Sequence, residues 1–479
     1  MNSNKGEISE ENNMLKAGLW YTISSISIKA IGIITTPLYT RLLSTSDYGK
    51  VITMTSWYSI ISVFVVMALY YSIGRAKIDF PGKLNEYVGS LQLFSGLVTL
   101  ILTIFCIVFI KPVSALLGMN KAYTLILLLY LMAEPAIILN QNKYKYQYKY
   151  KSNIAISVYI TLATLGMSFA LIFILPDRGI GRALGIVLSA AFLSLGMWIS
   201  ALKNGYIHWN TKYIVYGLKI SVPLILHTIS LSIMAQSDRL VITKFFGDTQ
   251  TAIYSLAYQY AVLIDLVLNA VGQAWLPWFH DTYGTGHTEL IREKVKPLVV
   301  LGGVVTIGAV AIAPEAMMIL GPKDYQVGVW VVAPVAFGTF IKYLFQNYEH
   351  VELHIKKTWY ISAATLVGAG ANVVLNYYFV PRYGFIAAAY TTMVCYIFLM
   401  LAHNFVVRAI LKQHVYSDCF FYLSSIVCGI LCVGAVLLYP YVLVRYMSIT
   451  AIVIVFLASN KTAIKEMLKK KKVKDKWKE

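Results

Sequence analysis

Charged residues are scarce in this 479-residue chain: Asp, Glu, Lys and Arg together make up 13% of it. That share is about half of the roughly 25% found in soluble domains. A water-soluble protein of this length would form two or three domains with charged outer faces, and too little charge is present to coat them. The composition therefore excludes an ordinary soluble enzyme and predicts a polytopic membrane protein.

Cysteine is scarce as well. The five cysteines are an odd number with no C-x-x-C pair, and all lie in or beside apolar runs. This pattern excludes a disulfide framework and a zinc site, and we expect no metal and no other cofactor. No glycine-rich phosphate cradle of the ATP-binding type precedes a predicted helix. ATP hydrolysis is therefore not expected to drive the protein.

Acidic residues are few, 22 against 41 Lys and Arg, which leaves a net charge of +19. Such an excess is typical of nucleic-acid-binding proteins, but here it gathers at the chain end, where residues 461–479 contain nine lysines. No aromatic-basic motif of a nucleic-acid-binding fold accompanies it. We expect a solvated tail held near anionic membrane lipids, and no nucleic-acid partner.

Apolar runs of about 20 residues, long enough for a helix to cross roughly 30 Å of hydrocarbon, recur along the whole chain. The predicted fold is an all-α polytopic membrane protein with about fourteen transmembrane helices. The predicted spans are 16–41, 48–72, 87–110, 122–142, 153–176, 183–202, 215–243, 252–276, 297–320, 326–349, 359–379, 385–407, 418–438 and 441–459.

Lys and Arg concentrate in the connections on one side of these spans, and the positive-inside rule makes that side cytoplasmic. An even number of spans then places both termini in the cytoplasm. No cleavable signal peptide is expected, because the polar N-terminus lacks a small-residue cleavage site and leads into a long apolar run. We expect the plasma (inner) membrane of a bacterium or archaeon.

Lys or Gln alternates strictly with Tyr in residues 143–151, within one predicted cytoplasmic connection. Nine residues between two spans are too few for a sheet or an RNA-binding domain. We interpret the tyrosines as rings at the lipid headgroup level and the lysines as positive-inside residues.

Turn motifs recur about 205 residues apart. The matched pairs are Pro176 and Pro381, Gly179 and Gly384, Ala183 and Ala388, Arg41 and Lys244, and Tyr48 and Tyr254, at spacings of 203 to 206. These pairs predict two six-helix lobes. Because six is an even number, the lobes are parallel repeats about an axis along the membrane normal. The predicted domains are a first lobe at 1–203, a second lobe at 204–412, two additional helices at 413–460 and a basic cytoplasmic tail at 461–479.

Three motifs carry a family resemblance. R-L-L-S-x-x-D-Y-G follows the first span, D-R with F-G…I-Y surrounds the seventh, and P-x-Y-G-x-x-x-A-A follows the eleventh. They resemble the oligosaccharide flippase (polysaccharide transporter) family of the multidrug, oligosaccharidyl-lipid and polysaccharide exporter superfamily, of the O-antigen or capsule repeat-unit type. Arg182 and Ala387 stand where relatives often have Gly.

The resemblance implies two helical lobes around a central cavity. Such a protein moves a lipid-linked oligosaccharide from the cytoplasmic to the outer leaflet by alternating access, and its cargo carries a pyrophosphate between a polyprenyl lipid and the glycan. A polysaccharide polymerase and glycosyltransferases would be its partners.

Polar residues inside the spans mark candidate sites, because a charge at bilayer depth costs at least about 2.5–3.5 kcal/mol unless it faces water or a partner. Lys29 lies roughly 18 Å from either end of its span. A cationic lining suits an anionic cargo. A buried structural ion pair is the competing explanation for each charged residue. The predicted substrate-binding residues are Lys29, Ser25, Thr36, Arg239, Lys342, Gln346 and Asn269.

Three carboxylates are candidates for coupling transport to an ion gradient or membrane potential. They are Asp265, Glu134 and Asp238. For Asp238 the alternative is an ion pair with the adjacent Arg239.

Two other functions stay open. A cation-coupled multidrug or metabolite exporter would have acidic cavity groups and usually twelve spans. A membrane-embedded glycosyltransferase or polymerase would need an acid or base in a sizeable outer loop, whereas the predicted outer loops have at most about a dozen residues. The sequence favours a flippase that is not an enzyme.

Overall fold

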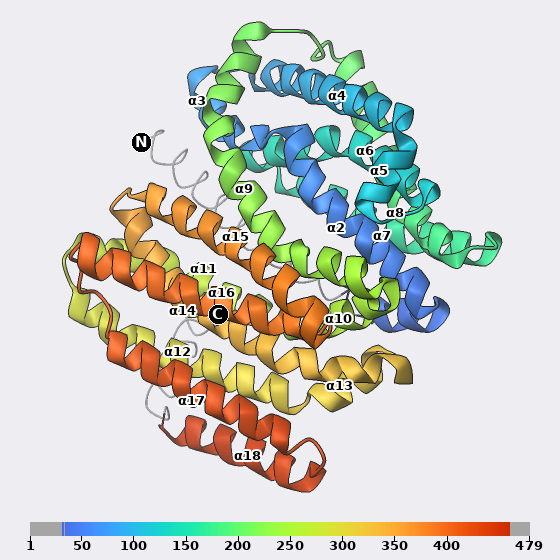
Figure 1. The fold of residues 1–479 in the computed structure, drawn as a ribbon. Coiled ribbons are helices and arrows are strands. Elements are labelled where there is room, and N and C mark those ends of the chain that lie inside the picture. The colour runs from blue at the N-terminus through green and yellow to red at the C-terminus, as the bar shows by residue number, and fades with distance from the viewer. Residues whose placement is uncertain (1–30, 33, 460–479) are drawn as a thin grey trace, which may run out of the picture. The chain divides into compact units, whose positions relative to one another are not determined.

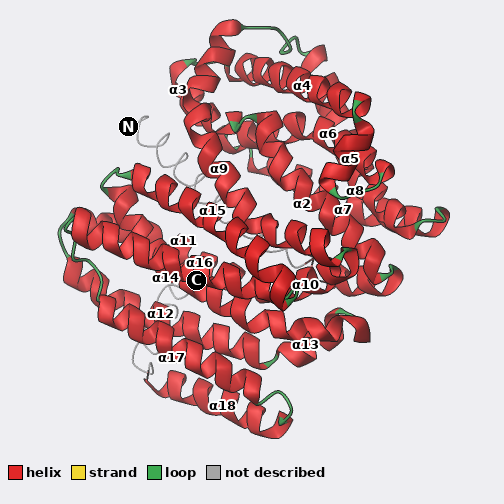
Figure 2. Cartoon of the chain, viewed as in Figure 1, coloured by secondary structure: helices red, strands yellow, loops and turns green. Residues whose placement is uncertain are grey.

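The computed structural model describes residues 31, 32 and 34–459, and within them it contains helices and no strand (Figure 2). Twelve of the described helices are long and apolar enough to cross a membrane, and α18 (Val442–Ser459) is a further apolar helix. The first predicted span, 16–41, lies mostly outside the described residues. The predicted all-α polytopic membrane fold is confirmed.

The chain divides into two compact units. Unit 1 consists of the described residues up to Ser255, together with Leu320–Asp324 and Thr365–Ala388; unit 2 consists of Leu256–Ile319, Tyr325–Ala364 and the described residues from Ala389. The predicted lobe boundaries stay a prediction.

Unit 1 is built mainly from long helices joined by short turns. Its elements are α2 (Thr45–Val66), η1 (Leu69–Ser72), α3 (Ile73–Asp79), α4 (Leu84–Val108), α5 (Ile110–Leu117), α6 (Lys121–Tyr146), α7 (Tyr150–Ile174), α8 (Arg178–Lys203), α9 (Thr211–Phe246), the first part of α10 (Asp248–Ala261) and most of α15 (Thr358–Tyr383).

The motif after the first predicted span is a helix N-cap. The Ser44 hydroxyl accepts a hydrogen bond from the backbone N–H of Asp47 at 3.0 Å and donates one to the Asp47 carboxylate at 2.7 Å. The negative charge in the first turn also suits the positive end of the helix dipole. Asp177 caps α8 in the same way, by accepting from the N–H of Ile180. Ser44 and Asp177 therefore fix where α2 and α8 begin.

Helices α7 and α8 pack closely because a glycine lies at their contact. A Cβ at Gly185 would lie 2.4 Å from the Cα of Ser168, closer than any side chain allows. Small residues of this kind let transmembrane backbones approach one another.

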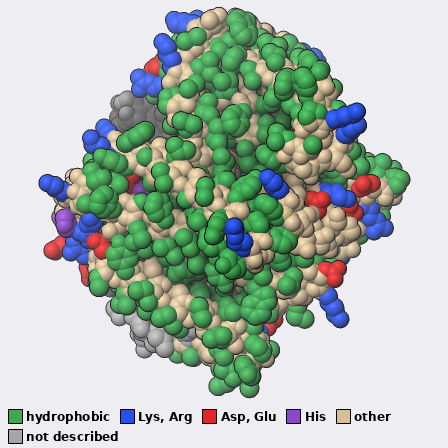
Figure 3. All heavy atoms as spheres, viewed as in Figure 1, with side chains coloured by type: hydrophobic (Ala, Val, Ile, Leu, Met, Phe, Trp, Pro, Cys, Tyr) green, Lys and Arg blue, Asp and Glu red, His purple; other side chains and the backbone are tan. Residues whose placement is uncertain are grey.

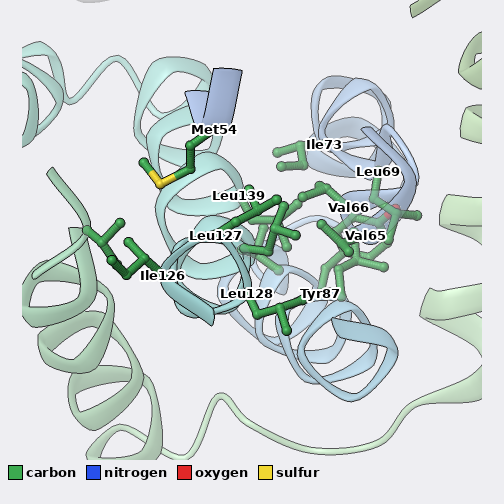
Figure 4. Packing of buried hydrophobic residues seen from close by; sticks show 14 of the residues in the cluster. Met54, Val65, Val66, Leu69, Ile73, Tyr87, Ile126, Leu127, Leu128 and Leu139 are labelled. Carbon is green, nitrogen blue, oxygen red and sulfur yellow. The ribbon is translucent and has the colours of Figure 1, made fainter. Parts of the chain in front are cut away.

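The core of unit 1 lies where α2, η1, α4 and α6 meet. Figure 4 shows Val66, Leu69, Tyr87 and Leu127 from these elements gathered in one cluster, and all four are buried. In lipid such contacts stabilise the fold by van der Waals packing more than by exclusion of water.

Unit 2 contains the remaining helices. They are the end of α10, α11 (Leu263–Gly284), α12 (Thr288–Ala311), α13 (Ala313–Leu320), part of η2 (Lys323–Gly328), α14 (Val329–His354), the start of α15, α16 (Ala387–Phe405), the π-helical turn η3 (Val406–Ile410), α17 (Asp418–Leu437) and α18. Helix α12 packs against α11, α14, α17 and α18 (Figure 1).

Helix ends in unit 2 extend beyond the predicted spans. The spans 252–276 and 297–320 leave a long connection, whereas α11 continues to Gly284 and α12 begins at Thr288. Hydropathy marks where the chain leaves hydrocarbon, but Glu, Arg and Lys are good helix formers. The helices therefore continue past the apolar residues.

Large apolar side chains are exposed on both units. Figure 3 shows hydrophobic side chains over much of the visible face, and Ile101, Leu162 and Ile430 are each more than half exposed. Water-soluble monomers rarely expose apolar patches of more than a few hundred Å², so these surfaces fit contact with lipid.

Candidate functional site

Two arginines of unit 1 act electrostatically on Tyr48 on α2. The Tyr48 hydroxyl interacts with the Thr36 side chain and lies in the electrostatic field of both Arg182 and Arg239. The Arg239 guanidinium also donates to the carbonyl oxygen of Ala235 at 2.6 Å. Two of the predicted substrate contacts, Thr36 and Arg239, thus share a cationic environment in unit 1.

Arg182 is a member of this group that the sequence reasoning missed. Its guanidinium donates to Ser168 Oγ at 2.6 Å and lies 3.8 Å from the ring centroid of Tyr39. The sequence offered a signal, an arginine within one turn of the start of an apolar helix, which we interpreted only as a departure from the family pattern. These polar and aromatic contacts fix the Arg182 guanidinium, and its remaining N–H groups can still donate hydrogen bonds.

Glu134 lies on α6, beside Pro135, and is half-buried. Its carboxylate accepts a hydrogen bond from the hydroxyl of Tyr58 on α2, and the Tyr58 ring stacks on Tyr130 with an interplanar angle of 5°. A carboxylate with a hydroxyl donor inside membrane-spanning helices can take up a proton without losing its partner.

Asp238 on α9 is the most deeply buried of the predicted coupling carboxylates, with an exposed fraction of 1%. It accepts a hydrogen bond from the Tyr254 hydroxyl on α10 at 2.6 Å and from the Asn376 amide on α15 at 2.7 Å. The same Asn376 amide lies 3.2 Å from Asn372 Oδ1. Tyr254, which is paired with Tyr48 in the repeated turn motifs of the sequence, therefore contacts the Asp238 carboxylate directly.

The Asp238 network contains uncharged hydrogen-bond donors. Neutral donors stabilise a buried carboxylate less than a cation does, since charge-assisted bonds are about twice as strong as neutral ones. The side-chain oxygens of Asp238 and Asn372 are hard ligands suited to an alkali cation or a proton.

Lys342 and Asp265, 77 residues apart in sequence, meet in unit 2. Lys342 Nζ on α14 lies 3.2 Å and 3.3 Å from the two carboxylate oxygens of Asp265 on α11, with side chains 30% and 20% exposed. Asn269 and Gln346 follow one helical turn later on the same two helices and are half-buried. The structure thus joins a predicted substrate contact to a predicted coupling carboxylate.

Two carboxylates and one imidazole form a second ionisable cluster in unit 2. His403 Nδ1 on α16 lies 2.8 Å from Glu352 Oε1, and its Nε2 lies 3.5 Å from Glu349 Oε1, both on α14. His403 and Glu352 are fully buried. A neutral imidazole has one N–H and cannot donate to both carboxylates. A neutral His403 ring therefore donates to only one of the two carboxylates at a time.

We expect that replacing His403 with Phe destabilises the protein strongly. A phenyl ring can keep the stacking on Phe345, whose centroid lies 5.5 Å away, but the carboxylate of Glu352 would stay buried without its partner. Breaking a buried pair in this way costs about 3–5 kcal/mol, and the apparent melting temperature in detergent measures it. The exposed His414→Phe is the control, and an equal melting temperature for both variants would contradict the expectation.

Two predicted contacts, Ser25 and Lys29, lie outside the described residues. Of the others, Thr36, Glu134, Asp238 and Arg239 belong to unit 1. Asp265, Asn269, Lys342 and Gln346 belong to unit 2.

The fold is that of a multi-pass membrane transporter. The chain is similar to the lipid II flippase MurJ in an inward closed conformation, with a TM-score of 0.75 and 13% identity over 93% of this chain and 100% of that one. It is also similar to a multidrug resistance MATE family transporter of the MOP superfamily in an inward-facing conformation, with a TM-score of 0.60 and 15% identity over 82% and 99%. Identities this low show the fold alone.

Sequence comparison identifies the family. The profile of the polysaccharide biosynthesis protein family matches residues 14–283, more than half of the chain, which therefore belongs to that family. A segment of 79 residues is 29% identical to protein 1 of the Lsg locus of Haemophilus influenzae and covers 16% of this chain and 20% of that protein. The resemblance inferred from the sequence motifs is confirmed.

Proposed function

We propose that this protein is a flippase for a polyprenyl-diphosphate-linked oligosaccharide. It moves this cargo from the cytoplasmic to the outer leaflet of the plasma membrane by alternating access, for surface polysaccharide biosynthesis. Membership of the polysaccharide biosynthesis protein family and a fold similar to that of a lipid II flippase over 93% of the chain support the proposal.

The observation that carries the proposal is the set of cations on membrane-spanning helices. Arg182 and Arg239 both act electrostatically on Tyr48 in unit 1, and the partly exposed Lys342 lies on α14 in unit 2. Guanidinium and ammonium groups bind phosphate oxygens through charge-assisted hydrogen bonds, and the low dielectric of a membrane site strengthens the attraction. Each of these groups by itself suits the diphosphate part of the cargo.

Asp238, Asp265 and Glu134 are the proposed coupling carboxylates. Asp238 is the most deeply buried of the three, and it accepts hydrogen bonds from the Tyr254 hydroxyl and the Asn376 amide. Asp265 is already neutralised by Lys342, so binding of the anionic cargo to Lys342 would release this carboxylate for a cation.

The protein itself forms no glycan bond in this proposal. Polysaccharide polymerase and glycosyltransferases act before and after it, and both of its termini lie on the cytoplasmic side of the inner membrane. Support for this orientation comes from the one-sided distribution of Lys and Arg.

A cation-coupled multidrug exporter is the second candidate. Its support is the similarity to a MATE family transporter and the deeply buried Asp238, because acidic groups suit a cationic drug. The arginines around Tyr48 favour the anionic cargo instead.

Transport by purified protein in liposomes distinguishes the two functions. We expect a polyprenyl-diphosphate-linked glycan with a fluorescent sugar to become accessible to a membrane-impermeant quencher on the far side, at a rate that depends on an imposed ion gradient. A fluorescent organic cation, tested in the same vesicles, should not move faster than in protein-free vesicles. Gradient-driven efflux of the dye without glycan translocation would favour the exporter.

A further inference from the structure

The Lys–Tyr segment 143–151 contributes to a pocket in unit 1. The pocket has a volume of about 410 Å³, within the range of small-ligand sites, and lies where α4 and α7 begin and α6 and α8 end. Its lining includes Lys143, Tyr144, Gln147, Lys149 and Tyr159.

Lys143 is the key side chain of this pocket. Only 8% of it is exposed, a burial that the sequence-based interpretation of this segment did not include. Its ammonium lies 5.0 Å from the ring centroid of Tyr144, and no described carboxylate lies within ion-pair distance of it. A buried ammonium without a counter-charge is costly.

The rest of the lining reinforces this charge. Every residue that lines the pocket is described, and none of them is Asp or Glu. Lys149 is exposed and adds a second positive charge. The Gln147 side-chain oxygen is buried and makes no hydrogen bond within the described residues. The pocket therefore combines two cations with a buried acceptor that has no partner.

We propose that this pocket binds a phosphate group that carries a hydroxyl. Lys143 and Lys149 hold the phosphate oxygens, and Gln147 accepts from the hydroxyl. Both a phosphatidylglycerol headgroup and a free phosphate ester have this chemistry. The pocket lining contains none of the residues assigned to the proposed transport function, and the proposal goes beyond that function because it does not depend on which cargo is moved.

The aromatic lining favours the same ligand class. Tyr144 and Tyr159 border the pocket, and tyrosine is the side chain that membrane proteins place at the depth of phosphate headgroups. The volume also leaves space for a glycerol or sugar beside the phosphate.

Binding to the purified full-length protein tests the proposal without a transport assay. In a neutral detergent, inorganic phosphate and glycerol 3-phosphate are titrated against thermal stability, with chloride at equal ionic strength as reference. The same measurement in phosphatidylcholine nanodiscs, with and without phosphatidylglycerol, tests the lipid. Stabilisation by the soluble probes assigns a free phosphate ester, and stabilisation that requires phosphatidylglycerol assigns a headgroup.

Lys143→Met should weaken whichever probe binds by roughly ten- to a hundredfold, the usual effect of losing a hydrogen bond to a charged group. Lys145→Met makes the same change in the same segment, at an exposed residue outside the pocket lining, and should bind like wild type. Equal affinity in Lys143→Met and wild type, or no stabilisation of wild type by any probe, overturns the proposal. If Lys143→Met does not fold, Lys149→Met decides: weaker binding supports the site, and unchanged affinity overturns it.

Discussion

Replacing Asp238 with Asn should abolish ion-driven transport while leaving the fold intact. Asn keeps the shape of the side chain and one carbonyl oxygen, so the hydrogen bond from Asn376 survives and the Tyr254 hydroxyl can turn to accept from the new amide. What the variant loses is the negative charge. Losing the charged partner of a bound cation costs about 1.5–3 kcal/mol, which weakens cation binding roughly ten- to a hundredfold.

The measurement has two parts. Sodium, titrated against potassium at constant ionic strength, and protons, titrated by lowering pH, are each tested for their effect on glycan translocation and on the melting temperature. Wild type should respond to one of these cations, and Asp238→Asn to neither. Asp324→Asn, at an exposed residue, is the control and should behave like wild type. A cation response that persists in Asp238→Asn would show that Asp238 is structural.

Hydropathy and turn chemistry were sufficient to predict the helical fold. Apolar runs must form helices in a membrane because every backbone polar group has to be satisfied within the segment. The break between α12 and α13 at Ile312 was not predicted, since the apolar run from 297 to 320 continues across it. A pattern of hydrophobicity carries no information about a bend within hydrocarbon.

The sequence pointed to single candidate residues but not to the contacts between them. Lys342 and Asp265 were each found from charge inside a span, yet assigned separate roles, because nothing in a single sequence joins positions on different helices. His403 was missed for a different reason. A lone histidine near the end of an apolar run looks like an interfacial residue, and only the structure brings it against Glu352.

The burial of Lys143 could not be predicted from the positive-inside rule. The positive-inside bias predicts on which side of the membrane a lysine lies. It does not predict that Lys143 is buried while Lys145 and Lys149 are exposed. Because α6 continues to Tyr146, Lys143 lies on a helix and is buried instead.

Replacing Lys342 with Met should reduce glycan translocation by roughly ten- to a hundredfold, if its ammonium binds the diphosphate with the strength of one charge-assisted contact. Met retains most of the apolar length of the side chain and removes the charge. The Lys342 side chain is 30% exposed, so it is not sealed inside the protein. Translocation rates at several cargo concentrations measure the effect, and Lys357→Met, at an exposed residue just beyond α14, is the control.

A double variant separates cargo binding from simple charge balance. In Lys342→Met the Asp265 carboxylate, 20% exposed, loses its partner, and this by itself could slow transport. Adding Asp265→Asn removes the unpaired charge. If Lys342 only balances Asp265, the double variant translocates at the rate of the single variant Asp265→Asn. If Lys342 binds the diphosphate, the double variant is slower than Asp265→Asn by the same factor by which Lys342→Met is slower than wild type. The interaction between the two substitutions is expected to be large for stability, because the side chains are in contact. The interaction is expected to be small for translocation, because the loss caused by Lys342→Met comes from weaker binding of the cargo and not from the lost contact with Asp265.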